Sequence, residues 1–424
     1  MSLPLTLSRL EEAVAGGVAA IRSRTRLQPA GGPGDKLFPP TYATGDRTLK
    51  YAVEKRRIDG EDVTCIVLDA VQSQANRMEE ALYGSWEDDG LPFPVIAVDF
   101  SAAPDLADLH EISTLHVPHR VYDALLRDSM ADGVLFRDTD LGKAITFASE
   151  RNATPMFRAC PTALLLGAWD STGPRGGMGT KFPRMLVSEI IAVRAVPGVK
   201  TTSRLDPAGI QANVPVYHLA TDPDDYTINS EEAQRDEKGN PKPFSRKGSE
   251  GKGKPSSINH SNVAPSVDIF AGGITCDRAL QTTVLSLAGL RRLRFPANAD
   301  GELLPPERRG KAESAARTTL AALSLVAMAL HREMGFDLRS RCALVPESPF
   351  LLELVDADGG PSENYSLSAD EARALLGDAH ARSREVGMGW TREPIRLTPA
   401  PKLVDLIRRS RSVAAAGGKE QGGE

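Results

Sequence analysis

The spacing of apolar residues along the chain predicts a mixture of helices and strands. Leu7 to Ile21 favours an N-terminal helix, whereas Leu27 to Tyr42 is too rich in proline and glycine for regular structure. The β-branched run from Val63 to Leu68 is typical of an inner strand. It leads directly into a helix whose apolar stripe is Val71, Ala75, Met78 and Leu82, and we expect this helix to end at Gly84.

Similar runs continue towards the C-terminus. Short strands are predicted at Pro94 to Phe100, Met185 to Val196, Arg341 to Val345 and Phe350 to Val355. Helices are predicted at Val121 to Met130, at the alanine-rich run from Glu313 to Met334, and from Ser368, which has Glu371 three residues on, to Glu385. This order favours an α+β sheet protein with one face of the sheet covered by helices.

Two segments lack such periodicity. Thr201 to Ser257 contains six prolines and long charged runs, so it is expected to be an exposed insertion too polar to fold alone. Residues 411–424 are expected to form a disordered tail.

The charge balance argues against an indiscriminate polyanion binder, because the 424 residues carry a formal net charge of −5. The cations are instead clustered, and a long anion could cross several clusters. Each cluster alone could equally be a solvated face. The clusters are Arg291, Arg292 and Arg294; Arg308, Arg309 and Lys311; Arg408, Arg409 and Arg411; and the segment from Arg235 to Lys254.

The remaining composition favours a soluble cytoplasmic protein. The four cysteines are far apart and form no CxxC pair, so we expect them to be reduced core residues. Charged residues interrupt the first apolar stretch, which excludes a signal peptide, and Leu320 to Leu330 is too short to span a membrane.

A glycine-rich loop within Pro161 to Ile191 offers the clearest candidate chemistry. It carries Arg175, Lys181 and Arg184 between apolar runs that we expect to be buried strands, and such a loop can grip phosphates through backbone amides and fixed cations. The Walker order of glycine, lysine and then serine or threonine is absent, because Thr180 precedes Lys181. The alternative is a flexible surface connection.

Other polar groups remain open to more than one interpretation. Gln72 and Asn76 lie on one side of their predicted helix, where Arg77 could bind a phosphate or pair with Glu79 or Glu80. His110, His116, His119 and Asp123 have a metal-like composition, but their loose spacing argues against zinc. Trp169 is expected to anchor the core, and Asp170 to hold Arg175 or cap a turn.

Several sequence blocks, in one order, resemble the backbone RAMP subunit of type I-U (I-G) CRISPR Cascade complexes, the GSU-type backbone family. The blocks are VQSQANRMEEAL, PHRVYDALLRDS, PTALLLGAWDST, KFPRMLVSEI and INHSNVAPSV. The resemblance implies an RRM-like (ferredoxin-like) palm with large insertions, spanning residues 61–196 and 258–410, after an N-terminal helix and wrapping segment at 1–60. The polar insertion at 197–257 is then the candidate for the thumb that kinks the guide.

The resemblance also implies a function without catalysis. Copies of such a subunit stack along one CRISPR RNA, contact other Cascade subunits, present the guide to target DNA, and need no cofactor or metal. The RNA-binding residues that it implies are Gln72, Asn76, Arg77, His119, Arg120, Arg127, Ser171, Thr172, Arg175, Lys181, Arg184, Asn259 and His260. An RNP1 octamer is missing, so backbone contacts are expected to dominate over base stacking.

Two rival hypotheses belong to other classes. A RAMP-type endonuclease that is independent of metal could use His119, His260 and Tyr122 as acid and base. A metal-dependent hydrolase could use the histidine cluster. The sequence does not show that the groups needed for either reaction lie close together.

Overall fold

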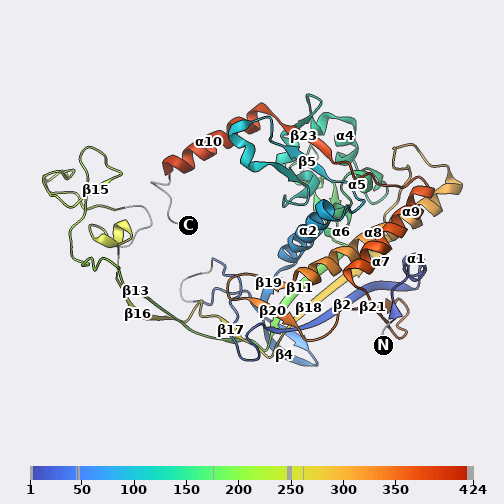
Figure 1. Ribbon diagram of the computed structural model, residues 1–424, viewed down its shortest axis with the longest axis horizontal. Helices are drawn as coiled ribbons and strands as arrows, with labels where there is room; N and C mark the ends of the chain where they lie inside the picture. The colour runs from blue at the N-terminus through green and yellow to red at the C-terminus, as the bar shows by residue number, and fades with distance from the viewer. Residues whose placement is uncertain are drawn as a thin grey trace. The chain divides into compact units, whose positions relative to one another are not determined.

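The computed structural model describes residues 3–43, 45, 48–174, 176–245, 251–260 and 262–417 (Figure 1). The chain divides into two compact units. Unit 1 comprises Met1–Thr44, Lys50–Val196 and Ile274–Leu403, and unit 2 comprises Gly45–Leu49, Pro197–Gly273 and Val404–Glu424. Among the described residues, no helix is both long and apolar enough to cross a lipid bilayer.

Unit 1 is built on a ten-stranded, mostly antiparallel sheet, which confirms the predicted α+β class. Its main strands follow the order β1-β22-β21-β2-β18-β11-β4-β3, and β19 and β20 lie off this path. Their bounds are Leu3–Pro4 (β1), Glu363–Ser366 (β22), Leu351–Asp356 (β21), Val18–Pro29 (β2), Arg278–Ser286 (β18), Leu186–Val193 (β11), Glu61–Asp69 (β4), Val53–Ile58 (β3), Phe336–Asp337 (β19) and Ala343–Pro346 (β20).

The centre of the sheet has a simple connectivity. Along the chain, β2, helix α2 (Val71–Asp88), β11, β18, helix α8 (Pro306–Met334) and β21 follow one another, with other elements inserted between them. Across the sheet, the four strands stand in the order β21-β2-β18-β11 and each neighbouring pair is antiparallel, with one register shift, between Val18 and Ala20, in the β2–β21 pair. Helices α2 and α8 pack against each other on one face of the sheet (Figure 1).

The helices agree with the prediction in type but not always in length. Helix α1 (Leu7–Ala15) ends at Gly16, well short of Ile21, because β2 begins at Val18. Helix α2 continues through Gly84 to Asp88, so that glycine does not end it. Helix α9 (Ala369–Glu385) begins with the predicted capping box of Ser368 and Glu371. Helix α8 starts seven residues earlier than predicted, and its last half is buried.

A second, five-stranded sheet in unit 1 carries many short helices. The single helix predicted from Val121 to Met130 is wrong, because the segment is split: Asp123 caps a new helix that begins at Ala124, with its side chain accepting a hydrogen bond from the N–H of Leu125. The strands are Glu111–Ser113 (β6), Ile96–Asp99 (β5), Ile395–Pro399 (β23), Ser129–Ala131 (β7) and Val134–Leu135 (β8). The short helices in this part of the chain are Pro104–Leu109 (η1), Arg120–Tyr122 (η2), Ala124–Arg127 (α3), Phe136–Asp138 (η3), Asp140–Thr146 (α4), Thr154–Ala159 (α5), Pro161–Leu166 (α6) and Gly176–Met178 (η4). Another short helix, α7 (Leu287–Leu290), follows β18 and contacts β2 and α8 instead.

Unit 2 is more ordered than its composition suggested. Strands β13 (Lys200–Arg204) and β16 (Val263–Asp268) form an antiparallel ribbon. Beyond it, Val216, Ala233 and Phe244 are buried, and the rings of His218 and Tyr226 contact Phe244. The expectation that this segment is too polar to fold alone therefore missed a small apolar cluster. Its other elements are Tyr217–His218 (β14), Tyr226–Thr227 (β15) and Pro255–Ile258 (η5), and the short strands Val196–Pro197 (β12) and Ile274–Thr275 (β17) pair before and after it.

The last helix, α10, spans Pro401–Gly417, so residues 411–417 are helical rather than disordered. The rest of the predicted tail, residues 418–424, lies outside the described residues.

Candidate functional site

A pocket of about 420 Å³ lies in unit 1 where three segments of the chain meet. Gly167 follows helix α6, the strands β9 (Ala168–Trp169) and β10 (Lys181–Phe182) pair as a hairpin, and His119 and Arg120 complete the wall. Five of the residues that the resemblance implied come together here, and a tryptophan joins them. The polar and aromatic lining is His119, Arg120, Trp169, Ser171, Lys181 and Arg184.

Glycines allow this hairpin to close. At Gly167 (φ +84°), an added Cβ would lie 2.8 Å from the Cγ of Arg184, which is too close for a side chain. At Gly179, an added Cβ would overlap the carbonyl oxygen of Asp170. Thr180 anchors the far end, because its hydroxyl donates to the carbonyl oxygens of Thr146 and Ala148. The expected buried strand before the loop is instead helix α6.

A buried ion pair forms the floor of the pocket. The Arg120 guanidinium donates to both carboxylate oxygens of Glu79, over 2.7 and 2.8 Å, and to the carbonyl oxygen of Gly167 over 2.9 Å. Burial raises the pKa of Glu79 to about 7, against the opposing pull of Arg120 and Arg184. Since the Arg120 side chain is only 6% exposed and already paired, we revise its role from RNA contact to support of the pocket.

Lys181 and Arg184 are the cations that the pocket offers to a ligand. Both are exposed, and neither forms an ion pair with a carboxylate in the described part of the chain. Desolvation, followed by repulsion from Arg120, lowers the pKa of Arg184, yet a guanidinium stays charged at physiological pH. The pocket can therefore neutralise a negatively charged group without first breaking a salt bridge.

The structure contradicts the expectation that Trp169 anchors the core. The indole is 48% exposed and lines the pocket. Its cross-strand neighbour is Lys181, whose Nζ lies 5.4 Å from the centre of the ring. The apolar run that precedes Trp169 suggested burial, but that run ends in helix α6 and the chain then turns outwards.

The loop between β9 and β10 presents Ser171 and Thr172 to solvent. Asp170 is 2% exposed and accepts a hydrogen bond of 2.7 Å from Arg137, so it fixes Arg137. Arg175, which we expected Asp170 to hold, lies outside the described residues.

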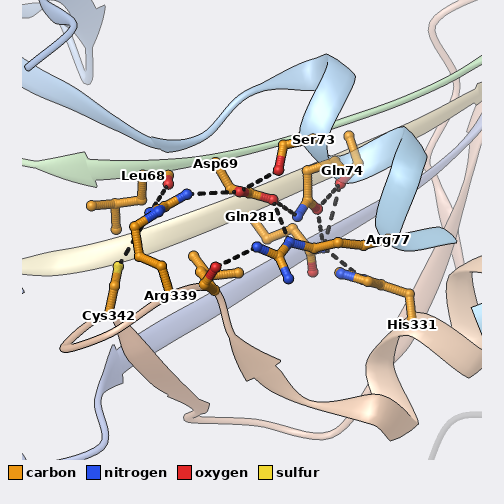
Figure 2. Close-up of polar contacts among 11 residues, drawn as sticks. Leu68, Asp69, Ser73, Gln74, Arg77, Gln281, His331, Arg339 and Cys342 are labelled. Carbon is orange, nitrogen blue, oxygen red and sulfur yellow. Dashed lines mark hydrogen bonds and ion pairs between the residues drawn. The ribbon is translucent and has the colours of Figure 1, made fainter. Parts of the chain in front are cut away.

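Arg77 belongs to a buried polar network, not to the pocket (Figure 2). Its Nε donates to Asp69 over 3.0 Å, and its terminal nitrogen donates to the carbonyl oxygen of Leu338 over 2.6 Å. Neither Glu79 nor Glu80 is its partner. Gln72 and Asn76, on the same helix, are exposed.

Asp69 is the centre of that network. Its carboxylate is fully buried and accepts hydrogen bonds from Ser73, Gln74, Arg77 and Arg339 (Figure 2). Arg339 also donates to the carbonyl oxygen of Leu68 over 2.7 Å. The network therefore ties helix α2 to strand β4 and to the turn after β19.

A chain of polar side chains continues from Gln74 between the helices and the sheet. The Oε1 of Gln74 accepts from Ser188 over 2.8 Å and from Gln281 over 2.9 Å, and Ser188 contacts Thr283. His331 ends the chain, with its Nδ1 3.5 Å from Gln281 (Figure 2). Burial, followed by repulsion from Arg77, lowers the pKa of His331 to about 4, so its imidazole is neutral.

The other RNA-binding residues that the resemblance implied lie outside the pocket. Arg127 pairs with the adjacent Asp128 over 2.8 Å. Asn259 and His260 belong to unit 2, where His260 contacts Asp206 over 2.9 Å.

Across the described ranges, no group of three or more His, Cys, Asp and Glu side chains could hold a metal ion. The cysteines are unpaired; Cys276 is half-buried and the other three are buried, as predicted for most of them.

Part of the chain that contains the pocket matches a known protein family. A family model described as CRISPR-associated protein GSU0053 matches residues 21–197, which contain most of β2 and all of β4, α2, β11 and the pocket. No curated protein matches the chain. The resemblance found in the sequence blocks is thus confirmed at the level of the family. Residues 21–197 of the chain are therefore similar to the GSU0053 family of CRISPR-associated proteins.

Proposed function

We propose that this protein is a non-catalytic backbone subunit of a type I Cascade effector, which binds CRISPR RNA and presents it for pairing with target DNA. The observation that carries the proposal is the pair of exposed cations, Lys181 and Arg184, in a pocket within the family-matched region. Phosphate contacts hold a strand in place without reading its sequence, which a subunit that accepts any guide requires.

The topology of unit 1 supports the proposal. The β-α-β-β-α-β order of β2, α2, β11, β18, α8 and β21, with the strand order β21-β2-β18-β11, is compatible with the ferredoxin-like palm that we propose. RRM domains, which bind single-stranded RNA, share this arrangement. The ribbon of β13 and β16 leaves this unit between β11 and β18 and is our candidate for the thumb.

The geometry disfavours the rival endonuclease. Tyr122 is buried, its hydroxyl donates to the carbonyl oxygen of Ile145, and burial raises the pKa of its phenol. It is therefore poorly placed to exchange a proton with a substrate. Incubating the protein with CRISPR repeat RNA separates the two hypotheses. Protection without cleavage supports the scaffold, whereas cleavage that is lost in His119→Ala supports the nuclease.

Reversing both pocket cations, with Lys181→Glu and Arg184→Glu, should weaken RNA binding by roughly 10- to 100-fold. The loss should be equal for guides of different sequence, because phosphates are the same in every guide. The slope of log affinity against log salt concentration should also fall by roughly one for each lost phosphate contact. Filter binding at several salt concentrations measures both effects.

The control for this prediction is the double variant Lys143→Glu and Arg151→Glu. Both residues are exposed cations outside the pocket, so the change in net charge is the same. If the control loses as much affinity as the pocket variant, or if the loss depends on the guide sequence, the pocket is not the phosphate site. Electron microscopy of the protein co-expressed with a CRISPR array tests the remaining part of the proposal, namely repeated copies along one RNA.

A further inference from the structure

We propose that the pocket holds one unstacked nucleotide of the bound RNA, with its base against the indole of Trp169 and its phosphate on Lys181 and Arg184. This inference rests on the proposed function and adds a base contact to it. The base contact is one that the sequence argued against, because the chain has no RNP1 octamer.

The exposure of Trp169 is the first observation. The chain has three tryptophans, and the other two, Trp86 and Trp390, are only 8% and 7% exposed. Trp169 is 48% exposed, although an indole is among the most apolar side chains. A half-exposed indole in a concave surface is suited to contact a flat, partly apolar partner, and every nucleobase has such a face.

The orientation of the ring is the second observation. Trp169 and Lys181 are cross-strand partners in the hairpin, and the ammonium lies over the ring. This contact restricts the rotamers of both side chains before any ligand arrives. The aromatic ring and the cation therefore belong to one site, as the base and the phosphate of one nucleotide do.

The size and lining of the pocket are the third observation. Its volume of about 420 Å³ lies within the range of sites that bind small molecules. Pro118 and Pro183 add apolar surface beside the indole, whereas Lys181 and Arg184 supply the charge. A site for phosphate alone needs no apolar wall. Because stacking is tolerant of base identity, this arrangement remains compatible with guides of any sequence.

Intrinsic fluorescence of the full-length protein tests the inference, since Trp169 is the exposed tryptophan. Two probes are compared, a short oligouridylate and inorganic polyphosphate of similar charge. We expect the oligouridylate to quench the emission and polyphosphate to bind without comparable quenching. Trp169→Leu should abolish the quenching and weaken oligouridylate binding by roughly 5- to 100-fold, with the affinity for polyphosphate unchanged. Trp169→Phe, which keeps an aromatic ring, should retain most of the affinity.

Phe147→Leu provides the matched control, because Phe147 is 64% exposed and does not line the pocket. It should leave both affinities unchanged. The inference is overturned if polyphosphate quenches as strongly as RNA, or if Trp169→Leu binds oligouridylate as tightly as the parent protein. If the parent protein binds no RNA, the proposed function fails as well. If RNA binding survives in Trp169→Leu and is lost in the Lys181 and Arg184 variant, only the base contact is wrong.

Discussion

Replacing Asp69 with asparagine is expected to lower the free energy of unfolding by about 3–5 kcal/mol, the usual cost of removing one partner from a buried ion pair. The carboxylate is fully buried and receives four donors, two of them from the guanidiniums of Arg77 and Arg339. The neutral amide cannot balance those cations, and its own NH₂ group would face further donors. Chemical denaturation, followed by circular dichroism, measures the difference.

Asp62→Asn is the matched control. Asp62 lies on the same strand as Asp69, but it is exposed and pairs with the exposed Arg57 over 3.4 Å. Such surface pairs contribute about 0–1 kcal/mol, so this variant should stay close to the parent protein. A loss of less than 1 kcal/mol in Asp69→Asn would show that the network does not hold helix α2 on the sheet.

A second large effect is expected from His331 on acidification. The pKa of its imidazole is about 4 in the folded protein and 6.5 in the unfolded chain. Between these values the unfolded chain binds a proton that the folded protein does not. The contribution of neutral His331 to the free energy of unfolding is therefore fully present above pH 6.5, and it is lost as the pH falls towards 4. A difference of about 2.5 pKa units corresponds to about 3 kcal/mol lost over this window.

His331→Gln isolates this contribution. Glutamine keeps a polar group near Gln281 but does not titrate, and any constant cost of the substitution is the same at every pH. The free energy of unfolding should therefore decline less steeply between pH 6.5 and 4 in the variant than in the parent protein. Parallel curves for the two proteins would contradict the assignment of a buried, neutral His331.

The buried polar network also explains which strands the sequence could predict. Strand β4 was predicted because its β-branched run is buried. The central strand β2 was missed, since its buried positions include Ser23 and Thr25 beside Ile21 and Leu27. Polar residues on the buried side remove the apolar alternation that marks a strand. Strand β18 was not recognised for the same reason, because Gln281 and Thr283 are buried there.

The candidate site was predictable only in part. The sequence pointed to the loop and to Lys181 and Arg184, because glycines and cations near apolar runs are a local signal. It could not show that Glu79, far away along the chain, neutralises Arg120, or that Asp69 does the same for Arg77. Exposure of Trp169 also depends on where helix α6 ends, and a single residue at Gly167 decides this.

The position of the ribbon in the chain has a consequence for evolution. Residues 194–277 leave and return between Val193 and Arg278, which are paired neighbours in adjacent strands. The sheet thus fixes both ends of this excursion, and the entropy of closing it grows only with the logarithm of its length. Ten extra residues would cost about 0.1 kcal/mol on that scale. Lineages could therefore lengthen, shorten or exchange this segment by recombination while the sheet beneath it stays the same.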